Sequence, residues 1–186
     1  LPLLICLTLS PAYARPAVDT QFSFYDIFPS SKATLGSEMR LRSPIKKGGR
    51  TFTGNTRWSV KWKFRSKKSN GLCSFTRVKT FVKGTYTMPR IPQDYEVNED
   101  VREAFSRYYQ VLFRHEKNHM QSGLYAARDI KKVLLSLDSF ASCKRLHKIA
   151  NSFAKKIIKK YNKRDEEYDR KTDNGKMEGV AIKNFL

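Results

Sequence analysis

The chain has 186 residues, of which 40% are hydrophobic and 12% aromatic, and its formal net charge is +20. This length and hydrophobic content predict one globular domain with a core of its own and exclude a chain that is disordered throughout. A positive charge of this size predicts attraction to anionic surfaces, or else a solvated basic face without a specific partner.

Residues 1–14 predict the end of an export signal. Their apolar run is too short to span a bilayer, and segment 12–14 (Ala-Tyr-Ala) has the small-x-small pattern of a signal-peptidase site. A lipoprotein anchor at Cys6 is disfavoured because Ile5 is bulky where such a site needs a small residue. We therefore expect a mature chain of residues 15–186, secreted or periplasmic, without a transmembrane segment. Its expected anionic partners are envelope polymers, phospholipid head groups or acidic proteins, and nucleic acid is disfavoured.

The first half of the mature chain predicts a small antiparallel sheet. Alternation favours a first strand over 21–27, and a short helix is expected over 34–41. Segment 51–65 is the clearest strand, because aromatic and aliphatic side chains alternate with arginine and lysine, so that one face packs and the other meets water. A hairpin turn at 70–71 (Asn-Gly) leads into the partner strand, 72–87.

Two cysteines remain once the export signal is removed, Cys73 and Cys143. An even pair in an exported protein predicts one disulfide, worth up to about 4 kcal/mol on the chain-entropy model. Two reduced core cysteines are the alternative. Zinc ligation by the pair is a weaker one, because the two lack the close spacing of a zinc-binding cysteine pair.

The second half of the chain predicts two helices and a polar tail. Asn98 is the expected N-cap of a long helix that continues to about Leu137. A second helix is expected over 139–162, with apolar residues on one face and lysines on the other. Residues 165–186 form a polar C-terminal segment whose composition does not require order. The expected fold class is α+β, with the small antiparallel sheet packed on the long helix and on the second helix.

The centre of the long helix carries the motif His115-Glu116-x-x-His119. At helical spacing both imidazoles lie on one face, roughly 5–6 Å apart, so both can reach one ion. Apolar residues continue this face in both directions and direct the pair toward the core. Zn2+ held there would lower the pKa of a bound water to near ~7, and Glu116 is placed to accept its proton. The alternative is two core histidines bonded to neighbours, with Glu116 merely solvated.

Several stretches together resemble a bacterial family of predicted secreted zinc-dependent proteases, catalogued as domain of unknown function 922. The matching stretches are Tyr-Asp-Ile at 25–27 with Glu-Met at 38–39, the strand segment 52–62, Gly-Leu-Cys at 71–73, the histidine motif 115–119 with Ala-Ala at 126–127, Cys-Lys-Arg-Leu at 143–146 with Ala-Asn at 150–151, and 168–175. They cover nearly all of the mature chain in the same order. The resemblance implies a zincin-like α+β fold, export and a peptidase activity.

One position departs from this family. Asn174 stands where the family usually has a histidine. If that histidine is the third metal ligand, its replacement leaves an amide oxygen, a weak donor for zinc. The alternatives for the third ligand are Asp173 beside it, His147 on the second helix, or no third ligand at all. His147 could instead make a polar contact at an interface. Tyr168 would supply a hydroxyl that stabilises an oxyanion if the C-terminal segment folds over the site, or would simply pack.

These observations predict an exported zinc-dependent metallohydrolase, a peptidase acting on a protein or peptide substrate. His115 and His119 are the expected metal ligands, Glu116 is the expected general base, and Asp173 or Asn174 would complete the site. The alternative is a catalytically degenerate zincin-like module that binds anionic cell-envelope components through its basic surface.

Overall fold

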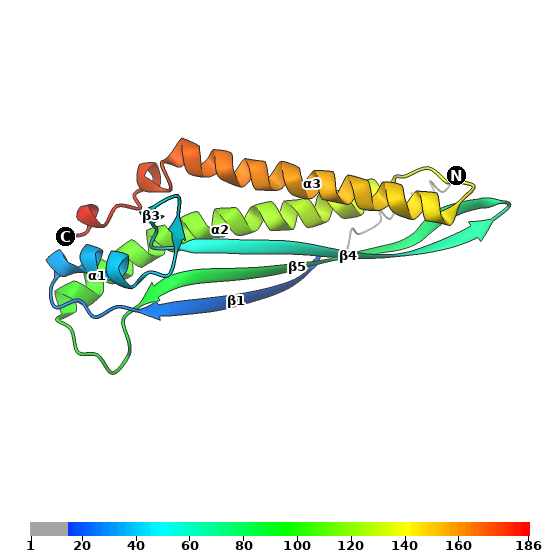
Figure 1. Cartoon of the computed structure of the whole chain (residues 1–186). Coiled ribbons are helices and arrows are strands. Elements are labelled where there is room, and N and C mark those ends of the chain that lie inside the picture. Colours follow the sequence, from blue (N-terminus) through cyan, green and yellow to red (C-terminus); the bar gives the residue numbers. More distant parts are fainter. Residues whose placement is uncertain (1–14) are drawn as a thin grey trace, which may run out of the picture.

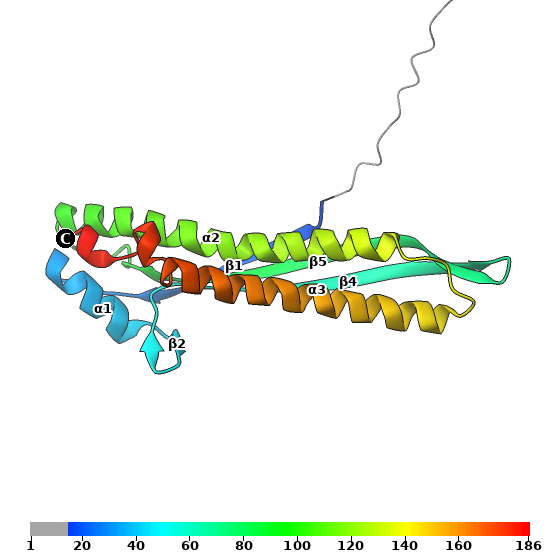
Figure 2. The same ribbon diagram turned by 90° about the horizontal axis from the view of Figure 1, so that it is seen from above.

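The computed structural model describes residues 15–186, and the expected export signal with Cys6 lies outside them. The chain forms an α+β fold, as predicted, whose two long helices lie side by side on one face of a sheet (Figures 1 and 2). In chain order the elements are β1 (Ala17–Asp26), η1 (Lys32–Thr34), α1 (Leu35–Arg42), β2 (Lys46–Lys47), β3 (Arg50–Thr51), β4 (Asn55–Ser69), β5 (Leu72–Arg90), α2 (Glu99–Leu135), α3 (Cys143–Thr172), η2 (Lys176–Glu178) and η3 (Ile182–Asn184).

The main sheet has three strands in the order β1-β5-β4. Strands β4 and β5 are antiparallel and joined at Asn70 and Gly71, whose φ angles of 48° and 78° suit a two-residue hairpin turn. This confirms the predicted hairpin. Strand β1, however, pairs with β5 in parallel, so the sheet is mixed and the expectation of an antiparallel sheet is wrong. Alternation marks a strand but says nothing of its direction, which here follows from the long connection through α1 and the β2–β3 hairpin.

Helix α2 agrees closely with the predicted long helix. It begins after Asn98, ends at Leu135 and buries one continuous stripe against the sheet and α3. The buried side chains of this stripe include Val101, Ala104, Tyr108, Leu112, His115, His119, Ala126, Ile130 and Leu134. No helix in residues 15–186 is apolar enough over a sufficient length to cross a membrane.

Helix α3 differs from the prediction at both ends, since it begins at Cys143 and continues to Thr172 rather than ending at 162. Beyond it, the C-terminal segment is folded: η2 and η3 return along α2, and the ring of Phe185 lies 5.8 Å from that of Tyr108. Residues 165–186 are therefore part of the domain rather than a separate tail.

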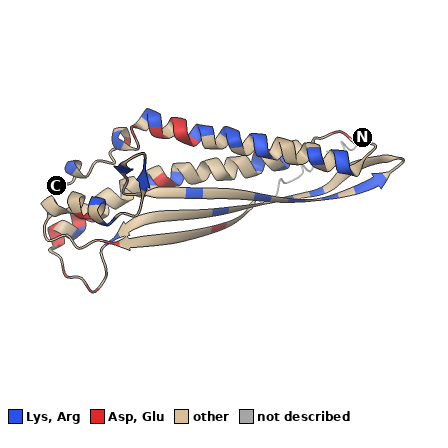
Figure 3. Cartoon of the chain, viewed as in Figure 1, with Lys and Arg blue, Asp and Glu red and all other residues tan. Residues whose placement is uncertain are grey.

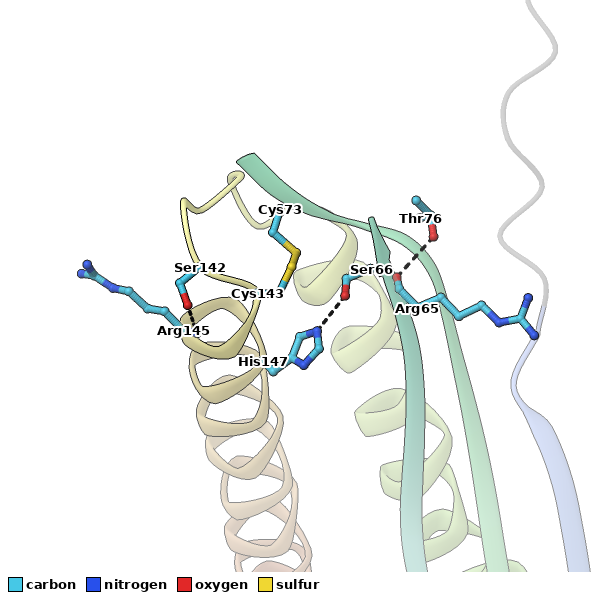
Figure 4. The surroundings of a disulfide bond; sticks show 8 residues. All are labelled: Arg65, Ser66, Cys73, Thr76, Ser142, Cys143, Arg145 and His147. Atoms are coloured by element: carbon cyan, nitrogen blue, oxygen red, sulfur yellow. Dashed lines mark hydrogen bonds between the residues drawn. A yellow bond between two sulfur atoms is a disulfide. The ribbon is translucent and has the colours of Figure 1, made fainter. Parts of the chain in front are cut away.

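The predicted disulfide is present and ties β5 to the first residue of α3 (Figure 4). Cys73 and Cys143 have Cα atoms 5.2 Å apart. His147 lies one turn further along α3, where its Nε2 atom is 2.8 Å from Oγ of Ser66 and its ring packs against Phe64 and Phe75. Of the two roles considered for His147, the structure shows the polar contact at an interface.

Candidate metal centre

Three side chains from two helices converge where the end of α3 that is far from the disulfide meets the middle of α2. His115 and His119 lie one turn apart in the middle of α2, and their Nε2 atoms are 3.3 Å apart. Oδ1 of Asp169, in the last turn of α3, lies 3.3 Å from Nε2 of His115 and 3.0 Å from Nε2 of His119. These groups form a candidate metal cluster among the described residues.

The dimensions of this triangle suit zinc. Ligand atoms at about 2.0–2.1 Å from a tetrahedral zinc ion are about 3.3 Å from one another. The three edges of the triangle, 3.3, 3.3 and 3.0 Å, match this spacing. Two imidazoles and a carboxylate are also a donor set that zinc accepts in catalytic sites, with a fourth position free for water or substrate. The residues present therefore fit the ion.

A further carboxylate contacts the Nδ1 atom of each histidine, on the side of the ring opposite Nε2. Nδ1 of His119 lies 3.5 Å from Asp165, whose other oxygen accepts a hydrogen bond of 2.6 Å from the indole of Trp58 on β4. Nδ1 of His115 lies 2.7 Å from Glu178 on η2. Such outer carboxylates fix the tautomer and the direction of metal-binding imidazoles, leaving Nε2 to face the ion.

Tyr168 is also brought to the centre, where its ring contacts the rings of both histidines. Its ring stacks on His115, with centroids 4.9 Å apart. Its hydroxyl donates to Glu178 at 2.7 Å and accepts from the amide of Asn118 at 2.7 Å. The C-terminal segment thus does fold over the site, but the hydroxyl expected to stabilise an oxyanion is engaged behind the imidazole of His115.

The histidines and Asp169 form a charged network. Burial disfavours a charged imidazole at His119, but hydrogen bonds with Asp165 and Asp169 outweigh it and raise the pKa of His119 to about 10. At His115, burial again lowers the pKa, but hydrogen bonds with Asp169 and Glu178 outweigh it, so the pKa of His115 is also raised. Burial alone would raise the pKa of Asp169, yet the two histidines hold it well below its usual range. A divalent cation bound here would take the place of the imidazole protons.

Glu116 is buried beside this network, with 4% of its surface exposed. Thr56 on β4 donates a hydrogen bond of 2.7 Å to its carboxylate, and a Cβ atom added at Gly54 would lie 2.8 Å from Oε1, so only glycine leaves room for it. Burial raises the pKa of Glu116, while the Thr56 hydrogen bond opposes the shift. The alternative drawn from the sequence therefore agrees with the structure in one half only: the histidines are bonded to neighbours, but Glu116 is buried rather than solvated.

A cavity of about 600 Å³ opens over these residues. Glu116, both histidines and Asp169 line one part of it, and the β2–β3 hairpin and the start of β4 line another. This space would admit a substrate to the candidate metal position while much of the centre stays covered.

Two of the residues considered as the third ligand, Asp173 and His147, have other partners. Asp173 is the left-handed C-cap of α3 and forms an exposed ion pair of 2.8 Å with Lys176. Asn174 lines the same cavity as both histidines and Asp169. His147 lies 22 residues before Asp169 on the same helix, about 33 Å away at ~1.5 Å per residue. The structure thus assembles His115 and His119 with Asp169.

Sequence reasoning did not find Asp165, Asp169, Glu178 or Thr56. Asp169 does stand inside stretch 168–175, which contributes to the family resemblance. A signal was also present in the spacing: Tyr161, Asp165 and Asp169 follow one another at four-residue intervals, which places them on one face of a continued helix. No comparable pattern marks Glu178 or Thr56.

The chain matches a family of known proteins. The profile of the family described as "Bacterial protein of unknown function (DUF922)" matches residues 22–176. No curated protein and no solved structure matches the chain. The matched range includes the histidine motif, Glu116 and Asp169, whereas Glu178 lies just beyond it.

Proposed function

The chain belongs to the bacterial family of unknown function DUF922, and from the geometry of its site we propose that it is a zinc-dependent hydrolase that cleaves peptide bonds. The observation that supports this most directly is the triangle of donor atoms on His115, His119 and Asp169, beside a buried carboxylate that is not itself part of the triangle. A purely structural zinc site has four protein ligands and needs no such carboxylate.

Zinc bound at this position would acidify a water molecule and polarise the carbonyl of a substrate. Glu116 would accept the proton of that water and pass it to the leaving amine. Its burial raises its pKa above the ordinary value of a glutamate, which makes the carboxylate a better proton acceptor. The Thr56 hydroxyl and the space beside Gly54 fix the direction of the carboxylate.

Asp165 and Glu178 would keep both imidazoles in the tautomer that presents Nε2 to the ion. The indole of Trp58 and the hydroxyl of Tyr168 in turn orient these two carboxylates. Tyr168 therefore has a positioning role in this proposal, in place of the oxyanion role suggested by its sequence position.

A peptide substrate is supported by the strand that borders the cavity. Strand β4 is at an edge of the sheet, and its first residues, 55–57, line the cavity beside the histidines. Backbone groups of an edge strand pair readily with an extended peptide. Export is part of the same proposal, and the Cys73–Cys143 disulfide supports it because such bonds persist in oxidising compartments.

The test is hydrolysis of a mixed library of internally quenched fluorogenic peptides by protein loaded with one equivalent of zinc. We expect cleavage by the wild type, and a loss of at least 100-fold in kcat/KM for Glu116→Gln with zinc content unchanged. Glu167→Gln is the matched control, because Glu167 is exposed and pairs with Lys171 on the outer side of α3. A Glu116→Gln variant as active as the wild type would remove Glu116 from the mechanism.

A further inference from the structure

The face of the sheet that the helices leave uncovered has two rows of cationic side chains. In β4 and β5 the apolar side chains point toward α2 and α3, and the alternate positions point outward. Arg57 begins the outward row of β4 and lines the cavity. The outward cations beyond it, here called the basic face, are Lys61, Lys63 and Arg65 on β4 with Arg77, Lys79 and Lys83 on β5. All six are exposed, and the blue segments along the two strands mark them in Figure 3.

Little on this face neutralises these charges. Strands β4 and β5 contain no aspartate or glutamate, and within residues 15–186 no ion pair involves any of the six side chains. The one acid in register with them is Asp19 of β1, opposite Lys83 at the margin. The carboxylates of Asp165, Asp169 and Glu178 instead lie against the two histidines on the helix side of the sheet.

The register of the hairpin places like charges directly opposite each other. Lys63 pairs with Lys79, and Arg65 pairs with Arg77. Like charges at directly opposed positions destabilise a sheet. Four cations thus form a compact grid, about 5 Å across the strands and about 7 Å along them. An anion with several charges would relieve this repulsion.

The shape of the basic face favours a linear polymer over a membrane. The β4–β5 hairpin is a long, twisted ribbon, so a flat bilayer would meet only part of it, whereas a flexible chain can follow both rows (Figure 1). Phe81 is the one large apolar side chain exposed among these cations, which leaves little to insert into lipid. Phosphate accepts both the point charge of lysine and the fork of arginine, and the face presents both.

We infer that the basic face is a docking surface for a linear phosphate-bearing polymer, which would hold the domain on its anionic surroundings while the metal centre, on the opposite face of the sheet, stays free. The inference does not depend on hydrolysis, because none of the six cations lines the cavity.

The test is the binding of fluorescently labelled linear polyphosphate to the zinc-loaded protein, measured by anisotropy over a range of salt concentrations. The fourfold variant Lys63→Gln, Arg65→Gln, Arg77→Gln, Lys79→Gln removes the grid. The matched control is Lys144→Gln, Lys148→Gln, Lys155→Gln, Lys159→Gln, which removes the same charge from exposed positions of α3. Vesicles containing half phosphatidylglycerol are the second probe.

We expect the sheet variant to bind polyphosphate at least tenfold more weakly at ~0.15 M salt, with a shallower salt dependence, and the α3 control to change it less than threefold. The sheet variant should melt no lower than the wild type, since repulsion is removed, and should cleave peptides at the wild-type rate. Equal losses in the two variants, or no binding by the wild type, would overturn the inference. If the protein binds vesicles as tightly as polyphosphate, and if this binding depends equally on the grid, the partner of the basic face would be a membrane and the inference of a polymer would be wrong.

Discussion

Oδ1 of Asp169 lies 3.0 Å from Nε2 of His119, although the two residues belong to different long helices. This contact joins the end of α3 to the middle of α2 and defines the third corner of the candidate metal centre. The functional proposal depends on it, because two histidines one turn apart are not by themselves enough for a catalytic zinc site.

Asp169→Asn should lower the affinity for zinc by more than 100-fold, because it replaces a carboxylate ligand with an amide. Asp173→Asn should leave zinc affinity within about threefold of the wild type, since Asp173 is exposed and pairs with Lys176. Competition with a chromogenic chelator measures both. The opposite order of effects would place the third ligand at Asp173.

Asp165→Asn should weaken zinc binding by about 10–100-fold, the usual effect of removing the carboxylate behind a metal-binding histidine. The loss acts through the direction of the His119 ring and through the indole of Trp58, which would face an amide instead of a carboxylate. Asp138→Asn, at an exposed position beyond α2, is the control. Equal affinities for wild type and Asp165→Asn would show that the ring needs no such support.

These residues also show what the sequence could and could not predict. The histidine motif, the β4–β5 hairpin and the long helix follow from local spacing, and the structure has all of them. Hydrophobic periodicity stops at residue 162, so the sequence predicts that the second helix ends there. Beyond that point its inward face has Asp165, Tyr168 and Asp169, which face the histidines rather than an apolar core. Apolar spacing therefore predicts the end of a helix at the point where its inward face becomes polar.

The sequence could not predict the direction of β1 in the sheet, for another reason. Its parallel pairing with β5 is fixed by contacts between segments far apart in the chain, and its residues alternate as they would in an antiparallel strand. Glu178 was missed for a similar reason, because only the folding of the C-terminal segment over α2 brings it to His115.

Zinc affinity should increase with pH between about 7 and 9. The pKa of His119 is raised to about 10, so in this range zinc has to displace its proton, which costs about tenfold in affinity for each pH unit below that pKa. The raised pKa of His115 adds to this dependence. Chelator competition at a series of pH values, corrected for the chelator's own protonation, measures the slope. A flat profile would mean that the histidines are neutral before zinc arrives.

The stability of the zinc-free protein should change with pH in the opposite sense. Because the folded-state pKa of His119 lies above its ordinary value of 6.5, its protonation stabilises the fold fully below pH 6.5, and this contribution is lost as the pH rises toward 10. Zinc-free protein should therefore lose stability to urea from pH 7 to pH 10, and His119→Gln should lose less over the same interval. Equal losses in the two proteins would contradict this assignment.

Replacing both cysteines, as Cys73→Ala with Cys143→Ala, should destabilise the domain by about 2–4 kcal/mol, since the bond closes a loop of 70 residues. Zinc affinity at low denaturant should stay unchanged, because the bond lies at the opposite end of α3 from Asp169. Urea unfolding of the zinc-free protein measures the first quantity. A drop in zinc affinity as well would show that the two ends of the helix pair are coupled.

The most direct test of the central proposal is a crystal structure of the protein grown with zinc, with the ion located by anomalous scattering at the zinc absorption edge. The proposal predicts one ion bound by Nε2 of His115, Nε2 of His119 and a carboxylate oxygen of Asp169, at about 2.0–2.2 Å, with Glu116 beside the open position. A zinc ion bound without Asp169, or histidines that keep their contacts with Asp169 and Glu178 in ample zinc and bind no ion, would contradict it.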